Sequence, residues 1–202
     1  MRKHDFQNLV EQVDRGNRKV NYSWDGMNQI VEVSGPQGFL KLDRDGNGNI
    51  ICLSINGQST WYDFDEMDRM TSMINEDGTS RHYAYNEIGN VLTRRDENGI
   101  LTTYSYDYDL LTLIDYSDDT PDVSFEHNLN RELTQITDAT GTSTYSYDDG
   151  GRLIAYSGPG QGDDFTYTLD SVNNRKSLTI EGLKDEYGYD ALNRLTQVQS
   201  NY

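Results

Sequence analysis

The chain has 202 residues, the size of one domain, but only 34% are hydrophobic, which leaves little apolar material for a thick core. Its 34 acidic and 17 basic residues give a formal charge of −17, which disfavours nucleic acid and anionic membranes as partners. Cys52 is the only cysteine, so an intrachain disulfide is excluded. No apolar run reaches the roughly 20 residues of a membrane-spanning helix.

One short unit recurs through the sequence. Each copy has an anchor residue, usually aromatic, followed by Asp or Asn, and usually a second aromatic two residues before the anchor, as in Tyr83-Ala-Tyr85-Asn86. Eleven of the 15 tyrosines occupy these two positions. A period of about 20 residues indicates one small unit copied along the chain. We place the anchors at His4, Trp24, Leu42, Phe64, Tyr85, Tyr106, His127, Tyr147, Leu169 and Tyr189.

Every copy predicts two strands and two tight turns. Tyrosines at i and i+2 face one side of a strand, and the Asp or Asn after the anchor can open a turn. The residue four past the anchor is Gly, Asn or Asp in eight of the ten copies, and these types tolerate positive φ. A second strand then ends at another turn, often Asn-Gly or Asp-Gly, as at 56–57, 77–78 and 98–99. The sequence therefore predicts an all-β fold, an antiparallel hairpin meander that curls into a spiral sheet, an arc or a partial barrel or shell.

In chain order, four stretches depart from this rhythm. Phe6–Val13 is the only one with any helical character, and it fits the strand register equally well. The other three predict irregular segments because the turn residues there are unusual or the spacing changes. They are Ser34–Gly38, Tyr108–Ser124 with its polar run Asp115–Pro121, and Ser157–Asp164.

The pattern Tyr-x-Tyr-Asp-x-x-Gly-Arg/Asn-Leu followed by Asp-x-x-Gly resembles the YD repeats of the RHS-repeat family, over nearly the whole chain. The resemblance implies a non-catalytic wall. Arrays of this family coil into a hollow shell around the C-terminal toxic part of polymorphic or insecticidal toxins, and related shells occur in teneurin-like surface proteins. The family's C-terminal cleavage motif is absent from this sequence.

A candidate calcium loop begins at Asp43. Asp43, Asp45 and Asn47 match the first half of a calcium-binding loop, in which oxygen ligands alternate along the chain. The twelfth position, which needs a bidentate Glu, holds Ser54, and strand sequence flanks the loop. The sequence therefore favours an acidic repeat turn, with a calcium site as the alternative. No other cofactor is expected.

Three functions remain open from the sequence. The first is a structural repeat module that helps to enclose or present an effector, with no catalytic residues. The second is a carbohydrate- or receptor-binding adhesion module that uses exposed rows of Tyr with Trp24 and Trp61. The third is an enzyme with paired acids in the loops Asp115–Asp119 or Asp163–Asp164. The histidines at His4 and His127 replace anchor aromatics, which favours packing.

We expect residues 1–202 to form a single array of about ten repeats within a longer protein, because neither end has the polar capping repeat that arrays need. Its partners would be the rest of that chain or the enclosed effector. Bare edge strands would also allow self-association. The family resemblance implies a secreted or cell-surface bacterial protein, although the first residues lack a signal-peptide pattern.

Overall fold

A computed structural model describes residues 2–5, 8–13, 16–160, 162 and 164–201. These residues form twenty β-strands joined by turns and loops, and none of them is helical. They divide into two compact units, Met1–Leu101 and Thr102–Tyr202, which are described separately below.

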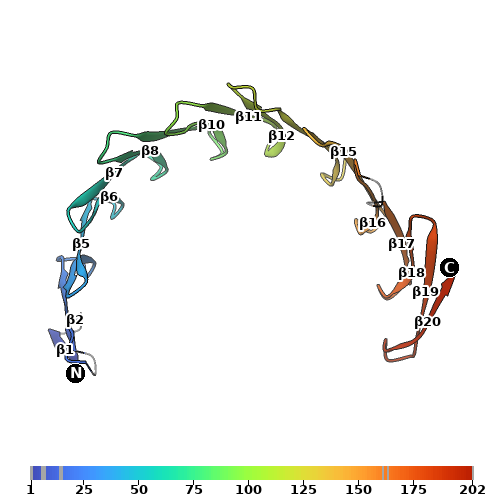
Figure 1. Ribbon diagram of the computed structural model, residues 1–202, viewed down its shortest axis with the longest axis horizontal. Helices are drawn as coiled ribbons and strands as arrows, with labels where there is room; N and C mark the ends of the chain where they lie inside the picture. Colours follow the sequence, from blue (N-terminus) through green and yellow to red (C-terminus); the bar gives the residue numbers. More distant parts are fainter. Residues whose placement is uncertain (1, 6–7, 14–15, 161, 163, 202) are drawn as a thin grey trace. The chain divides into compact units, whose positions relative to one another are not determined.

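The first unit is an antiparallel meander in which each strand pairs with the next one along the chain (Figure 1). Its strands are β1 (Arg2–Asp5), β2 (Asn8–Val13), β3 (Lys19–Trp24), β4 (Ile30–Gly35), β5 (Gly38–Arg44), β6 (Ile50–Ile55), β7 (Gln58–Phe64), β8 (Met70–Asn75), β9 (Ser80–Tyr85) and β10 (Val91–Arg95).

The second unit has the same consecutive antiparallel pairing. Its strands are β11 (Leu101–Asp107, whose first residue ends the first unit), β12 (Leu110–Tyr116), β13 (Val123–His127), β14 (Leu133–Asp138), β15 (Gly141–Tyr147), β16 (Leu153–Ser157), β17 (Phe165–Leu169), β18 (Arg175–Ile180), β19 (Leu183–Tyr189) and β20 (Leu195–Asn201).

Cross-strand register places the tyrosines two before the anchors and their aliphatic partners on one face of each sheet, whereas Phe39 and Trp61 lie on the other face. Tyr22 lies opposite Val33, and Val33 lies opposite Leu40 on the next strand. Since side chains alternate between faces, the intervening Ser, Thr, Asn and charged residues lie on the other face. Each cross-strand apolar pair contributes roughly 0.2–1 kcal/mol, so the sheet is stabilised pair by pair.

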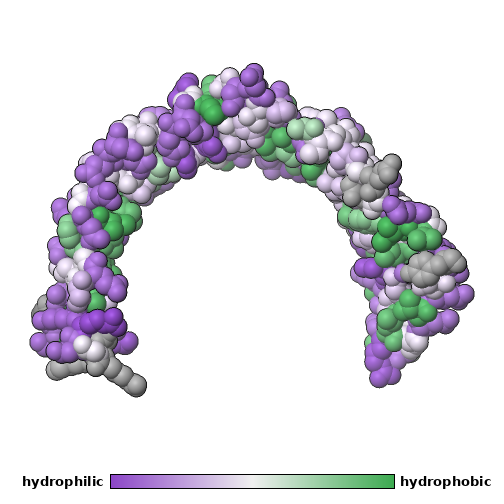
Figure 2. Space-filling model, viewed as in Figure 1, coloured by the Kyte–Doolittle hydropathy of each residue, from purple (hydrophilic) through white to green (hydrophobic). Residues whose placement is uncertain are grey.

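Neither unit has a buried apolar core among the described residues. The buried side chains are polar, namely Ser72, Thr102 and Ser177, with exposed fractions of 5%, 4% and 8%. The tyrosines at and two before the anchors are half-buried, and hydrophobic residues reach the surface in both units (Figure 2). The array is therefore a single-layer sheet whose rings are covered by neighbouring repeats. This confirms the predicted all-β meander of hairpin repeats. That the whole array curls, and that residues 1–202 form a single domain, stay predictions.

A β-bulge precedes every anchor and shows that one anchor was misplaced. The cross-strand register shifts just before Trp24, Phe64 and Tyr147, as it does in the other copies. In β5 the shift comes between Asp43 and Arg44, so Arg44 and not Leu42 is the anchor. With this correction the anchors Trp24, Arg44 and Phe64 are equally spaced along the sequence, and Asp45 becomes the Asp that opens the turn. A bulge adds one residue to one strand of a pair and increases the local twist, so the twist of the sheet increases once in every repeat.

The predictions for the departing stretches were partly wrong. Ser34–Gly38 is a tight hairpin, because Gly35 pairs with Gly38 across a two-residue turn. Within Tyr108–Ser124, residues 110–116 form β12 and residues 123–124 begin β13, so 108–109 and 117–122 lie outside strands. The predicted loop at 157–164 is confirmed for its described residues 158–160, 162 and 164. Asn8–Val13 is strand, while residues 6, 7, 14 and 15 lie outside the described part.

Candidate functional site at the repeat junctions

In eight copies the turn after the anchor is closed by its Asp or Asn side chain, whereas after Tyr106 the residue Asp107 pairs with Leu110 across a two-residue turn. In the copy at Asp65, the Oδ1 atom accepts hydrogen bonds from the backbone N–H groups of Met67 (2.9 Å) and Arg69 (3.0 Å). The backbone N–H of Asp65 donates to the Arg69 carbonyl at 2.9 Å. A carboxylate or amide oxygen thus satisfies donors that the tight turn would otherwise leave to water. The same pair of side-chain contacts recurs at Asp25, Asp45, Asn86, Asn128, Asp148, Asp170 and Asp190.

The fourth residue of this turn takes a left-handed backbone conformation. Asp68 has φ 58° and its N–H donates to the Asp65 carbonyl at 3.0 Å. The predicted preference for Gly, Asn or Asp at this position is confirmed for most copies, since these types tolerate positive φ. In the corrected copy the residue is Gly48 and not Gly46, and at 131 an arginine takes the conformation with φ 69°.

The residue after that position joins one repeat to the next. Arg69 donates from Nε to Asp65 Oδ2 at 2.7 Å and from Nη1 to the carbonyl of Asn86, in the following turn, at 2.8 Å. Its guanidinium also lies 4.8 Å from the centre of the Tyr85 ring. Asn174 plays the same part in the second unit, where its amide bonds Asp170 Oδ2 and Asn193 Oδ1, both at 3.0 Å.

Anchor tyrosines supply a second junction. The Tyr85 hydroxyl donates to the Met70 carbonyl at 2.7 Å, and the Tyr147 hydroxyl donates to the Leu133 carbonyl at 2.9 Å. In both cases the acceptor lies six residues after the preceding anchor. Burial raises the pKa of both phenols, so each hydroxyl stays protonated and can donate.

In the second unit, contacts between aromatic rings also join neighbouring strands. The rings of Tyr145 and Tyr156 lie 5.3 Å apart, those of Tyr156 and Phe165 lie 5.6 Å apart, and those of Phe165 and Tyr167 lie 5.9 Å apart. These separations fall in the range in which aromatic pairs attract one another beyond their buried area. We call these four residues the aromatic row.

Acid should weaken the turns. The hydrogen bond from Arg69 holds the pKa of the Asp65 carboxyl below its usual value, as the hydrogen bond from Arg152 does for Asp148. A depressed folded pKa contributes stability that is complete above the unfolded pKa and is lost as the pH falls through the folded one. We therefore expect the free energy of unfolding, measured by urea titration, to be similar at pH 7 and 5 and to fall below about pH 4.

An internal control separates this effect from general charge. Asp65→Asn keeps the Oδ1 acceptor, as Asn86 does naturally, but removes the titrating group. The variant should therefore lose less stability between pH 5 and 3 than the wild type. A stability that rises steadily down to pH 3 would show that relief of the −17 charge outweighs the turns and would contradict the expectation.

Two of the three proposed calcium ligands, Asp45 and Asn47, belong to one of these turns. Asp45 Oδ1 accepts the N–H groups of Asn47 (3.0 Å) and Asn49 (2.9 Å), and Asn47 Nδ2 donates to Asp68 Oδ1 at 2.8 Å. Asp43 lies on β5, where its Oδ1 atom forms an ion pair with Lys41 Nζ at 3.3 Å. Among the described residues no three His, Cys, Asp or Glu side chains gather as a metal group would. The calcium site stays a prediction, and the geometry accounts for Asp45 and Asn47 as turn residues.

The other acids considered for catalysis lie in separate places. Asp115 is on β12, Asp118 in the following loop accepts the N–H of Thr120 at 3.1 Å, and Asp164 accepts the N–H of Gly158 at 3.2 Å. Asp163 lies outside the described residues. Three residues that join repeats were missed from the sequence: Arg69, Asn174 and Asn49, whose amide donates to Asp68 Oδ1 at 2.7 Å. Their signal was the recurrence of Arg or Asn five residues after the anchor.

Comparison with known proteins gives the same repeat. Residues 129–163 match the family model for the RHS Repeat. The chain is 29% identical over 194 residues to the tRNA3(Ser)-specific nuclease WapA of Bacillus spizizenii, an alignment that covers 93% of this chain and 7% of that protein. It is 23% identical over 214 residues to the tRNA nuclease WapA of Bacillus subtilis, with 84% and 9% covered. The chain thus spans less than a tenth of either relative.

Solved structures share the fold. The crystal structure of TcdB2-TccC3-Cdc42 superposes with a TM-score of 0.66 and 14% identity, over 98% of this chain and 13% of that one. The Tc holotoxin pore of Photorhabdus luminescens gives a TM-score of 0.65 with 14% identity, over 96% and 12%.

Together, the fold and the repeated junctions define a class of protein, the single-layer arrays of antiparallel β-hairpin repeats. Residues 129–163 identify the repeat, and its register continues through the described copies on both sides. The chain thus contains an RHS repeat at residues 129–163, and similar hairpin repeats on both sides of it make the chain a structural repeat module.

Proposed function

We propose that this chain is a segment of the wall of a longer RHS-repeat protein, and that this wall encloses or presents a C-terminal effector. The curated relatives support the first half, since the chain corresponds to only 7% and 9% of their lengths. Their names describe whole proteins as tRNA nucleases, which is consistent with an activity carried outside the repeats. The effector of this protein would be of the same general kind, a toxic domain.

The observation that carries the proposal is the way that repeats join. Neighbouring repeats are bonded through turns, as at Arg69 with Asn86, and through anchors, as at Tyr85 with Met70. Such a sheet needs no second layer, so it grows by adding copies and forms a surface. Within the described part of the chain, the apolar residues cover one another in that surface and do not converge on a cleft with catalytic groups.

Proteolysis of the longer protein tests the proposal. The sequence that follows the repeats in the reading frame should be cut slowly by a non-specific protease while the wall is intact. A variant that opens the wall, such as Gly38→Ala, should expose that sequence to rapid cleavage, whereas Gly26→Ala should not. Equal cleavage rates in all three proteins, or a reading frame with no domain beyond the repeats, would contradict enclosure.

The proposal also implies that the protein is exported from the cell. A wall that carries an effector acts on other cells, so we propose a secreted or cell-surface location, with any export signal elsewhere in the longer protein. Among the described residues no helix is long and apolar enough to span a membrane. Immunodetection in the culture medium and on intact cells tests the location, and retention of all the protein inside the cell would contradict it.

A carbohydrate- or receptor-binding role is the second candidate. The observation in its favour is that Trp61 on β7 is 44% exposed, which leaves part of an indole ring able to stack on a sugar. The aromatic row favours structure instead, because its rings contact one another. Binding on a glycan array that is lost in Trp61→Ala would support this candidate, and an empty array would remove it.

A further inference from the structure

A groove of about 430 Å³ lies on the first unit, between the turns that follow the successive anchors Arg44 and Phe64. Residues of these two turns line it together with Ile51 on β6 and Trp61 on β7. The strands and turns that build the groove lie within residues 38–75, which the structure describes without a gap. Its volume falls in the range of small-molecule sites.

Trp61 gives this groove an aromatic surface. Its side chain is 44% exposed and lies on the face of the sheet opposite the tyrosines. The same position, three residues before the anchor, is polar in every other copy from β3 to β19, where it holds Asn, Lys, His, Thr, Ser or Glu. The requirements of the repeat therefore do not account for an indole ring at this place.

Carboxylates surround the ring. Four of the residues that line the groove are acidic, namely Asp45, Asp63, Asp65 and Asp68, and none of the described lining residues is Lys or Arg. Arg69 neutralises Asp65 through an ion pair at 2.7 Å, which leaves the charges of the other three. The hydrogen bond from the Asn49 side chain holds the pKa of the Asp45 carboxyl below its usual value, so Asp45 is ionised at neutral pH. The groove therefore favours a cation.

Each of these three carboxylates already accepts hydrogen bonds from the chain. The Ser72 hydroxyl donates to Asp63 Oδ2 at 2.5 Å, Asp68 Oδ1 accepts two side-chain amides of the preceding turn, and both oxygens of Asp45 are bonded within their own turn. A metal ion needs several oxygen ligands that converge, and a primary ammonium group needs acceptors for three N–H groups. A quaternary ammonium group has no N–H to satisfy and binds through its charge and through contact of its methyl groups with an aromatic ring.

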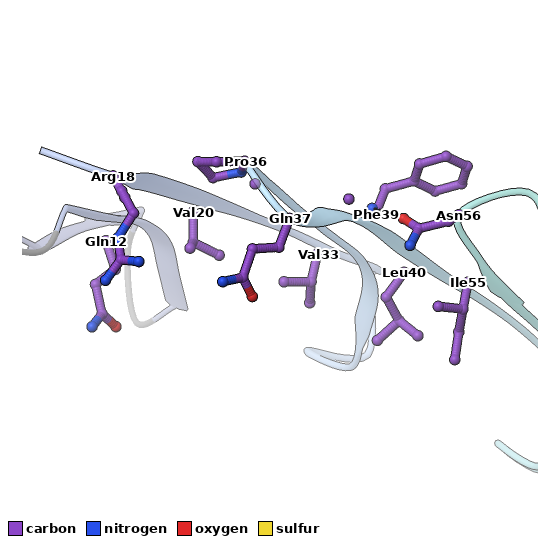
Figure 3. A pocket seen from close by; sticks show the side chains of 12 residues that line it. Gln12, Arg18, Val20, Val33, Pro36, Gln37, Phe39, Leu40, Ile55 and Asn56 are labelled. Carbon is purple, nitrogen blue, oxygen red and sulfur yellow. Dashed lines mark hydrogen bonds between the residues drawn. The ribbon is translucent and has the colours of Figure 1, made fainter. Parts of the chain in front are cut away.

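The larger groove beside the β4–β5 hairpin, of about 470 Å³, provides a contrast (Figure 3). Val33, Leu40 and Ile55 line it with aliphatic side chains, and Figure 3 shows Phe39 pointing to the opposite side of the strands. Phe39 is 44% exposed, as Trp61 is, and lies on the same face of the sheet, but it does not line the groove at Trp61. Phe39 is therefore a matched control for Trp61.

We propose that the groove at Trp61 binds a quaternary ammonium group, with its methyl groups against the indole and Ile51 and its charge facing Asp45, Asp63 and Asp68. Trp is the aromatic side chain that attracts a cation most strongly. This goes beyond a structural role, because it gives one place in the wall a small-molecule ligand. The carbohydrate candidate uses the same ring but requires no charge, so an empty glycan array would leave this proposal standing.

Titration with choline, followed by the indole N–H signals of Trp24 and Trp61 in NMR spectra, tests the proposal. Choline chloride replaces sodium chloride at constant ionic strength, so general attraction to a chain of charge −17 does not change. We expect a saturable shift of the Trp61 signal and no saturable shift of the Trp24 signal. The neutral isostere 3,3-dimethyl-1-butanol and the primary ammonium ethanolamine should each bind at least about tenfold more weakly.

Substitutions at the groove and beside it complete the test, with the backbone N–H of Asp63 as the reporter. Trp61→Ala should weaken choline binding about tenfold, and Phe39→Ala should not change it. Asp68→Asn keeps the side-chain oxygen and tolerates the positive φ, so it should lower the affinity about threefold through charge alone. Glu66→Gln removes a charge from the same turn outside the groove and should have a smaller effect.

The NMR spectra of the variants also show that they are folded, which the exposed positions of these side chains favour. Three results would overturn the proposal. The first is no saturable shift of the Trp61 signal, the second is equal affinity for the three probes, and the third is an effect of Phe39→Ala as large as that of Trp61→Ala.

Discussion

Replacing Gly38 with alanine should destabilise the first unit by about 3 kcal/mol, because it combines backbone strain with a steric clash. Gly38 has φ 129°, a region that side chains rarely adopt. A Cβ atom there would lie 1.7 Å from Asn56 Oδ1. That oxygen accepts the N–H of Phe39 at 2.9 Å, so moving it away breaks a link between two hairpins. Urea denaturation followed by circular dichroism measures the loss.

Two other glycines separate the causes. Gly57 has φ 91° but open space around its Cβ position, so Gly57→Ala should cost only the strain, about 1 kcal/mol. Gly26 has neither a positive φ nor a neighbour within 4 Å, so Gly26→Ala should be close to neutral. If the three substitutions had equal effects, the clash with Asn56 would not matter and the hairpins would not be linked in this way.

Tyr85→Ala should cost about 2–3 kcal/mol, the second large effect. The substitution removes the ring that lies under Arg69, its contact with Tyr83 at 6.5 Å between ring centres, and the hydrogen bond to Met70. Tyr85→Phe removes only the hydroxyl and leaves the Met70 carbonyl to water, so it should cost about 1 kcal/mol. The same denaturation experiment measures both variants.

Tyr147 tests whether this junction is general. Its hydroxyl makes the equivalent bond to Leu133, so Tyr147→Phe should cost about as much as Tyr85→Phe, about 1 kcal/mol. Tyr108 is a suitable negative control, because its side chain is 86% exposed and should tolerate truncation. If Tyr108→Ala cost as much as Tyr85→Ala, mutual cover of the anchors would not be the source of stability.

The sequence predicts the repeat well because particular positions of the repeat require particular residue types. An aromatic two before the anchor, Asp or Asn after it and a residue that tolerates positive φ are each required by local geometry, so they recur and can be counted. The misplaced anchor in β5 arose because Asp43 and Asp45 both fit the turn-opening position. Only the cross-strand bulge before Arg44 distinguishes them, and it depends on the partner strand.

Two other errors also have local causes. The turn after β11 contains no glycine, and Tyr108 itself takes φ 55°, so the strand that starts at Leu110 looked like loop. At Pro36 a two-residue turn between two glycines looked like a longer irregular segment. The recurrence of Arg or Asn five residues after the anchor marks the positions of Arg69 and Asn174, but their acceptors could not be predicted, because a long polar side chain can reach several acceptors and the neighbouring repeat decides which one it bonds.

Hydrogen exchange resolved by strand tests the central claim, that each hairpin repeat is held in place by its neighbours. The account predicts high protection in inner strands such as β6–β9 and β14–β17, and less in β1 and β20. Tyr85→Ala should lower protection in β8, β9 and β10 and leave β14–β16 unchanged. If protection were uniform along the chain, or if Tyr85→Ala lowered it equally in all strands, the claim would be contradicted.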